Sequence, residues 1–241
     1  MKLYVNGDSH SAGAEAVNSY CFAEDDSRCS WLGRQAHPDN LAVSYGSLMA
    51  DHYKAVFYCD AESASSNDRI FRTTRAFLEK NRPDLVVIGW ATMEREEWLH
   101  NGTYYQVSAG GGDSVPAELR DRYKQWVIDQ AYYETINNKY IQMHQRIFDF
   151  HNELADKNIP HLFFNTYSTF ETLLHLEYLG AKPFDWHNCF IGPYDKNYTY
   201  YNWLKANGCR TVNPQSYHFG PAAHKKWAEY LLNEIKARCL L

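Results

Sequence analysis

The chain has 241 residues, of which 45% are hydrophobic and 22% charged, a composition typical of a globular protein with one sizeable core. Its net charge of −5 argues against a broad surface for nucleic acid or anionic membranes. No apolar run approaches the ~20 residues of a membrane span. The apolar stretch after Met1 and Lys2 is too short for a secretory signal, so a cytoplasmic location is expected. The six cysteines include no Cys-x-x-Cys pair, which predicts free thiols and no zinc site.

Apolar runs alternate with helical patterns along the chain. The runs expected as strands are Leu3–Val5, Ala55–Tyr58, Leu85–Gly89 and His161–Phe164. Apolar spacing predicts helices over Leu41–His52, Asn67–Asn81, Trp126–Lys157, Thr169–Leu179 and Pro221–Arg238. The alternation predicts a three-layer α/β/α sandwich, with a parallel sheet of about five strands in flavodoxin-like order. Residues 1–241 are expected to form a single domain, with an irregular insertion at about 90–124.

Polar or small residues follow each predicted strand, at the edge where parallel α/β sheets bind ligands. The first such segment is Gly7-Asp8-Ser9-His10. A serine there is either an ordinary turn residue or a nucleophile, and a nucleophile needs a base. His218, just before the last predicted helix, is the imidazole available near the end of the chain. Its alternative interpretation is a plain loop residue.

These residues occur in an order that resembles the SGNH (GDSL-type) hydrolases. Gly7-Asp8-Ser9 matches the first block of that family, and His218, followed six residues later by His224, matches the last. Residues 63–67 and 88–92 lie where the second and third blocks fall. The resemblance spans most of the chain apart from the insertion, and it implies the fold already expected.

The resemblance also implies roles. Ser9 would be the nucleophile and His218 the general base, then the general acid toward the leaving group. Backbone N–H groups of Ser9 and of the Ala64-Ser65 turn would face the developing oxyanion. No metal and no organic cofactor is implied.

Three positions depart from the family pattern. Ala91 stands where the family has an oxyanion-donating Asn, so that Thr92 or Asn67 would have to substitute. Gln215 replaces the acid three residues before the histidine. Gln215 itself, a backbone carbonyl, or an acid of the preceding loop would then orient His218; the acids there are Asp185 and Asp195. Ala64 replaces a glycine, which is a mild change because a backbone N–H does not require glycine.

Several polar residues receive structural interpretations. Asp8 is expected to accept hydrogen bonds from the N–H groups of its turn, and His10 and His224 to be structural. His144, Asp149 and His151 have helical spacings that fit a metal site, but a solvated helix face is the preferred interpretation.

The leading hypothesis is a serine esterase that cleaves an ester through an acyl-enzyme on Ser9. Aromatic residues make up 16% of the chain, and with the habits of the family they favour an acetyl ester on a carbohydrate as substrate. An aromatic surface would also serve an oligomer contact. The alternative is a binding or structural module that keeps this fold with weakened turnover, of the kind that tailed phages carry in their virions.

Overall fold

The computed structural model describes residues 1–21, 35–111, 115–175 and 182–241. Its central sheet holds β1 (Lys2–Asn6), β2 (Val56–Cys59), β3 (Leu85–Trp90) and β6 (His161–Asn165). The strands are all parallel, in the order β2-β1-β3-β6. Beyond β6, Phe190 forms an isolated parallel bridge with Phe163, so the fifth of the five expected strands is reduced to one bridge.

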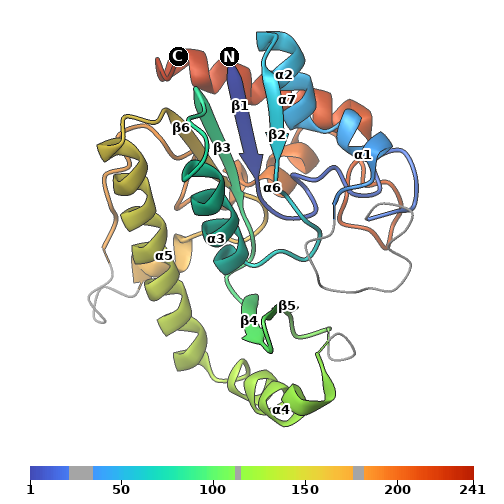
Figure 1. Ribbon diagram of the computed structural model, residues 1–241, viewed down its shortest axis with the longest axis vertical. Coiled ribbons are helices and arrows are strands. Elements are labelled where there is room, and N and C mark those ends of the chain that lie inside the picture. Colours follow the sequence, from blue (N-terminus) through green and yellow to red (C-terminus); the bar gives the residue numbers. More distant parts are fainter. Residues whose placement is uncertain (22–34, 112–114, 176–181) are drawn as a thin grey trace.

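Helices cover both faces of the sheet, which confirms the predicted α/β/α class (Figure 1). On one face lie α3 (Asn67–Leu78) and α5 (Tyr133–Asp156), whose apolar side chains share a core with Val86 and Ile88. The other face carries α2 (Tyr45–Tyr53), α6 (Tyr200–Ala206) and α7 (Pro221–Ala237). All six residues of β3 are buried because both of its faces are covered. Across the described ranges, no helix combines the length and apolarity of a membrane span.

Two predicted helices are each split in two. The helix expected over Leu41–His52 is α1 (Pro38–Ala42) followed by α2, because Ser44 leaves the helical conformation and caps α2 by accepting the Ser47 N–H. The helix expected over Trp126–Lys157 is α4 (Arg120–Asp129) and α5, with a turn at residues 130–132.

Part of another predicted helix has the wrong type. Within Thr169–Leu179, residues Glu171–His175 form a 3-10 helix, and residues 176–179 lie outside the described ranges. Two further short 3-10 helices in the described part of the chain are Ala117–Leu119 and Lys196–Tyr198.

The insertion at about 90–124 was predicted to be irregular, but it has regular structure. It contains the antiparallel hairpin of β4 (Glu96–His100) and β5 (Thr103–Val107), followed by α4. Asn101 and Gly102 form the hairpin turn, both with positive φ, at 48° and 77°. That dipeptide is the preferred sequence for a tight hairpin turn, and it was the available signal. Trp98 and Trp126 pack with Val107 in a small separate core, and Arg72 of α3 pairs with Glu97 at 2.7 Å.

Candidate active site

The loop after β1 is a tight turn that only glycine can enter. A Cβ on Gly7, which has a φ of 155°, would lie 2.2 Å from Ser11 Oγ and 2.8 Å from the Gly89 carbonyl oxygen. The Asp8 carbonyl then accepts the N–H groups of Ser11 and Ala12, and Asp8 Oδ1 accepts that of His10 at 3.1 Å. Asp8 is therefore the predicted turn acceptor, and it fixes the backbone on which Ser9 sits.

The second oxygen of Asp8 ties this turn to two other segments at the same edge of the sheet. Thr166, directly after β6, donates its hydroxyl to Asp8 Oδ2 at 3.1 Å. Arg95, from the start of the insertion, places Nη1 3.6 Å from that oxygen and donates to the Ser65 carbonyl at 3.3 Å. The loops that follow β1, β2, β3 and β6 are thus joined around one carboxylate that is 2% exposed.

A carboxylate that the sequence interpretation missed holds the ring of His218. Glu15 Oε2 lies 2.5 Å from His218 Nδ1 and also accepts the Ser216 hydroxyl at 2.6 Å. Ser216 Oγ in turn accepts the His218 N–H at 2.9 Å, which closes a ring of three residues. Burial alone would raise the pKa of Glu15, but the hydrogen bonds from His218 and Ser216 outweigh it and hold this pKa below its usual value.

Glu15 occupies the place for which Gln215 and Asp185 were candidates. The Gln215 side chain is exposed, and its N–H donates to Asn213 Oδ1. Asp185 accepts the His187 N–H, and Asp195 caps the 3-10 helix that begins at Lys196. The candidates suggested by the sequence precede the histidine along the chain, whereas the carboxylate found at its ring follows the serine by six residues.

His218 is brought to the turn that carries Ser9. Its ring centroid is 5.3 Å from that of His10, the neighbour of Ser9 in sequence. Among the described residues, no group pairs with His218 Nε2 or with the Ser9 hydroxyl. With Nδ1 on the Glu15 carboxylate, Nε2 is the nitrogen that remains to exchange a proton.

His10 and His224 are buried and neutral, in agreement with their structural interpretation. Burial lowers the pKa of His10 to about 4 and that of His224 to about 3. His224 Nδ1 accepts the Tyr45 N–H at 3.3 Å at the start of α2. Both rings contact the ring of Tyr200, with centroids 5.1 and 6.0 Å away.

Two backbone N–H groups implied for the oxyanion have no acceptor within the described part of the chain, namely those of Ser9 and Ala64. The Ser65 N–H, in contrast, donates to the Glu62 carbonyl at 3.1 Å. Ala64 adopts a φ of 64°, a left-handed conformation that costs a residue with a Cβ about 1–2 kcal/mol. Alanine was expected from the sequence to be a mild replacement for glycine at this position. That expectation is wrong, because the backbone here takes a conformation that favours glycine.

The two side chains considered as substitute donors differ in their availability. The Asn67 side chain makes two hydrogen bonds to the backbone of Ala91: its Oδ1 accepts the Ala91 N–H at 2.8 Å, and its Nδ2 donates to the Ala91 carbonyl at 3.1 Å. Nδ2 also contacts Met93 Sδ at 3.4 Å, so the amide is fully engaged. Thr92, half-buried next to Ala91, has no partner for its hydroxyl in the described ranges.

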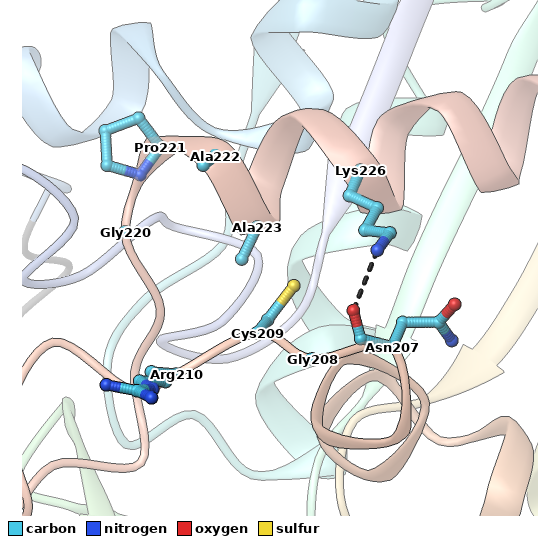
Figure 2. Close-up of a pocket in the computed structure, with 9 residues that line it drawn as sticks. All are labelled: Asn207, Gly208, Cys209, Arg210, Gly220, Pro221, Ala222, Ala223 and Lys226. Carbon is cyan, nitrogen blue, oxygen red and sulfur yellow. Dashed lines mark hydrogen bonds between the residues drawn. The ribbon is translucent and has the colours of Figure 1, made fainter.

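A pocket is shown in Figure 2, between the Asn207–Arg210 turn and the first turns of α7. Its volume is about 430 Å³, and its lining includes Cys209 and Lys226 but neither Ser9 nor His218. Lys226 crosses it and donates to the Asn207 carbonyl at 2.8 Å (Figure 2). The pocket is thus separate from the Ser9 turn.

The four parallel strands and the helices on both faces form an α/β/α fold of the class predicted from the sequence, with the Gly-Asp-Ser turn at the carboxyl edge of the sheet. The chain matches no family model and no curated protein. Similar solved structures include an acetyl xylan esterase of the rumen bacterium Butyrivibrio proteoclasticus (11% identity, TM-score 0.42), with 99% of this chain and 64% of that one covered. A second acetyl xylan esterase has 12% identity, a TM-score of 0.47 and coverage of 98% and 100%. A G-D-S-L family protein from Desulfitobacterium hafniense, described as a putative lipolytic protein, has 14% identity, a TM-score of 0.36 and coverage of 100% and 99%.

Proposed function

We propose that this chain is a serine hydrolase that cleaves esters through an acyl-enzyme on Ser9, with His218 as the proton carrier and Glu15 as the acid that orients it. The carboxylate contact at His218 Nδ1 is the observation that carries this proposal. A structural histidine needs no carboxylate of its own, whereas a catalytic one gains both the correct tautomer and a stabilised imidazolium from it.

The proposed steps follow from the free atoms of the site. Ser9 Oγ attacks the ester carbonyl while His218 Nε2 takes the hydroxyl proton. The N–H groups of Ser9 and Ala64 donate to the oxyanion, and the Thr92 hydroxyl is the available third donor. His218 then returns the proton to the departing alcohol, which leaves an acyl group on Ser9. Water, activated by the same nitrogen, releases the acid and restores the serine.

An active-serine probe tests the chemistry. We expect a fluorophosphonate to label the protein and p-nitrophenyl acetate to be hydrolysed, with both activities lost in Ser9→Ala and His218→Ala. Removal of a triad member typically lowers kcat by about 10⁴-fold or more. Ser47→Ala, at a half-buried serine of α2, is the matched control and should behave as the wild type. Absence of labelling together with turnover at the Ser9→Ala background would overturn the proposal.

The preferred substrate is proposed to be an acetyl ester on a carbohydrate. Three tyrosine rings lie together, with centroids 5.1 Å apart for Tyr167 and Tyr201 and 6.0 Å apart for Tyr167 and Tyr217. Tyr167 and Tyr217 are 45% and 60% exposed. Tyr217 directly precedes the base, and Tyr167 follows the Thr166 that binds Asp8. Such rings offer an apolar face with a polar edge, which suits a sugar next to the scissile ester.

The substrate class is tested by comparing an acetylated xylo-oligosaccharide with p-nitrophenyl acetate. We expect Tyr217→Ala to lower kcat/KM for the oligosaccharide by about 3- to 10-fold, since aromatic contacts contribute about 0.5–1.5 kcal/mol. Hydrolysis of the small ester should be unchanged. Tyr133→Ala, at a ring that is 74% exposed on α5, is the control. Equal losses for both substrates would argue against a sugar-binding role for the tyrosines.

The engaged amide of Asn67 favours a second candidate, a module that binds such esters with little turnover. With Ala91 in place of an asparagine and Asn67 bonded to Ala91, the site lacks a side-chain amide donor at that place. Loss of one such donor typically costs about 10²–10³ in kcat. Tight binding of the acetylated oligosaccharide by wild type and Ser9→Ala alike, with no turnover by either, would favour this candidate.

A further inference from the structure

A second cluster of reactive side chains lies at the opposite edge of the sheet from Ser9. It joins His151 near the end of α5, His161 at the start of β6, and Cys189 just before the Phe190 bridge. One potential ligand atom from each side chain lies within 4.8 Å of those of the other two. His151 and His161 are 1% and 2% exposed, so the predicted solvated helix face is wrong at His151, and also at His144, which is 3% exposed. The prediction does hold for Asp149, which is exposed.

The hydrogen bonds of the two histidines direct a nitrogen of each toward the other. His161 Nδ1 lies 2.8 Å from the Ile159 carbonyl, which can only accept, so this nitrogen carries the proton and Nε2 has the lone pair. That Nε2 lies 2.8 Å from His151 Nδ1. The far nitrogen of His151, Nε2, lies 3.3 Å from His187 Nδ1, and Asp185 Oδ2 lies 3.6 Å from His187 Nε2.

This arrangement is typical of histidines that bind a metal. Metal-binding imidazoles usually donate their other N–H to a carbonyl, a carboxylate or another fixed acceptor, which orients the ring. Ile159 supplies that acceptor for His161, and His187 backed by Asp185 supplies it for His151. The backbone around the thiol is also held in place: Arg238 donates to the carbonyl groups of Asn188 and Phe190, on either side of Cys189.

We propose that His151, His161 and Cys189 form a binding site for a divalent transition-metal ion of the zinc type, which fastens α5, β6 and the segment before Phe190 to one another. Imidazole nitrogen and thiolate sulfur are ligand types that zinc prefers, and three protein ligands leave the fourth tetrahedral position for water or another ligand. Tetrahedral coordination places ligand atoms roughly 3.3–3.7 Å apart, given metal–nitrogen and metal–sulfur bonds of about 2.0–2.3 Å. The two histidine nitrogens are 2.8 Å apart, which is below this range, and the limit of 4.8 Å for all three ligand atoms exceeds it by about 1 Å, so shifts of about 1 Å suffice.

Binding is balanced in protons. The Cys189 thiol loses its proton to solvent as sulfur joins the metal. His151 changes tautomer: its proton leaves Nδ1, and Nε2 carries the N–H and donates a hydrogen bond to His187 Nδ1, so the imidazole stays neutral and presents the lone pair of Nδ1. One proton is therefore released for each ion bound.

Cobalt titration of the full chain tests the site, because Co²⁺ substitutes for zinc and gives a near-ultraviolet charge-transfer band only when a thiolate binds it. We expect the wild type to take up one equivalent with this band, and Zn²⁺ to abolish it. Saturating Zn²⁺, at about a hundredfold excess over Kd, should raise the Tm by roughly 5–10 °C. Absence of the band, or cobalt bound without it, would overturn the proposal.

The variants assign the band to these residues. Cys189→Ser is expected to lose the band and the thermal shift, while Cys209→Ser, at a half-buried cysteine beside the pocket of Figure 2, keeps both. His187→Ala should weaken cobalt binding by about 10- to 100-fold, since it removes the group that orients His151. A band that survives in Cys189→Ser would overturn the site. Circular dichroism of each variant confirms folding, and hydrolysis of p-nitrophenyl acetate should be the same in Cys189→Ser as in the wild type.

Discussion

The two edges of the sheet each gather histidines, but they hold them differently. At the carboxyl edge, His218 is partly exposed, and a carboxylate from Glu15 binds its Nδ1. At the amino edge, His151 and His161 are buried and bonded to each other, with a carbonyl and a further imidazole as outer partners. A serine turn adjoins the first group, and a cysteine adjoins the second.

This difference separates proton transfer from coordination. An imidazole that must gain and lose a proton benefits from a nearby carboxylate, which stabilises its charged form, and from access to substrate. An imidazole that binds a metal must stay neutral with a fixed lone pair, which burial and neutral partners provide. Changes at the carboxyl edge should therefore affect turnover, and changes at the amino edge should affect metal binding and stability.

The largest expected effect tests whether Glu15 makes His218 catalytic. Glu15→Gln keeps the shape of the side chain but removes its charge, so the imidazolium loses its partner and the ring can take the wrong tautomer. Loss of the equivalent acid in serine proteases lowers kcat about 10⁴-fold, and we expect a fall of about 10²–10⁴ in kcat for p-nitrophenyl acetate with little change in KM.

Variants at other residues test whether the effect on kcat is specific to Glu15. Gln215→Ala and Asp185→Asn, at the positions favoured by the sequence, should leave kcat within about threefold of the wild type, since Glu15 occupies His218 Nδ1. Glu134→Gln, at an exposed residue of α5, controls for loss of charge. If Glu15→Gln retains full turnover, or Gln215→Ala loses it, the carboxyl edge is not organised as proposed.

The next effect concerns the third oxyanion donor. Thr92→Val removes only a hydroxyl that has no partner in the described ranges, and we expect kcat to fall about 10²-fold with an unchanged free energy of unfolding. Asn67→Ala should do the reverse, because it leaves the buried N–H and carbonyl of Ala91 without partners and costs about 1–3 kcal/mol of stability. Urea unfolding and steady-state kinetics on both variants distinguish these roles, and the opposite pattern would assign the donor to Asn67.

The fold was accessible from the sequence where one pattern dominated. The four strands and α3 and α7 follow from continuous apolar runs, clear helical stripes and terminal signals such as Pro221. The hairpin of β4 and β5 was not predicted, because its strands are mostly half-exposed and belong to a small separate core. The dipeptide Asn101-Gly102 does indicate its turn.

The site was accessible only in part, for a geometrical reason. Ser9 and His218 belong to short motifs whose order along the chain can be recognised. Glu15 belongs to no such motif. Its contact with His218 depends on the path of the loop after β1, in which Glu15 itself takes a left-handed conformation with a φ of 60°. The contact of His151 with His161 likewise joins the end of a helix to the start of a strand, which no local spacing reveals.

Acid should destabilise the protein through buried histidines at both edges. Burial lowers the pKa of His10 and His161 to about 4 and that of His224 to about 3, against about 6.5 in the unfolded chain. Below pH 6.5 the unfolded state binds more protons than the folded one, so the free energy of unfolding decreases as the pH falls toward 4. Each histidine contributes up to about 1.4 kcal/mol per pH unit in that window.

Urea unfolding between pH 7.5 and 5 measures this slope. The lowered pKa of Glu15 acts in the same direction only near and below pH 4.5, so it does not confuse the result. His52→Gln, at an exposed histidine of α2, should leave the slope unchanged, whereas His10→Gln should reduce it. A free energy of unfolding that stays constant over this range would mean that the histidines of both edges are not buried in neutral form.

The smallest expected effect comes from relieving the backbone strain at Ala64, near the carboxyl edge of the sheet. Ala64 has a φ of 64°, and Ala64→Gly should raise the free energy of unfolding by about 1 kcal/mol because glycine adopts this conformation without steric cost. Ala155→Gly, in the regular helix α5, should lower it by a similar amount. If the N–H alone matters for the oxyanion, kcat of Ala64→Gly stays within about threefold of the wild type, since glycine keeps that donor. A marked loss of kcat in a more stable Ala64→Gly would show instead that the methyl group itself holds the turn in its working position, so that the strain serves the chemistry.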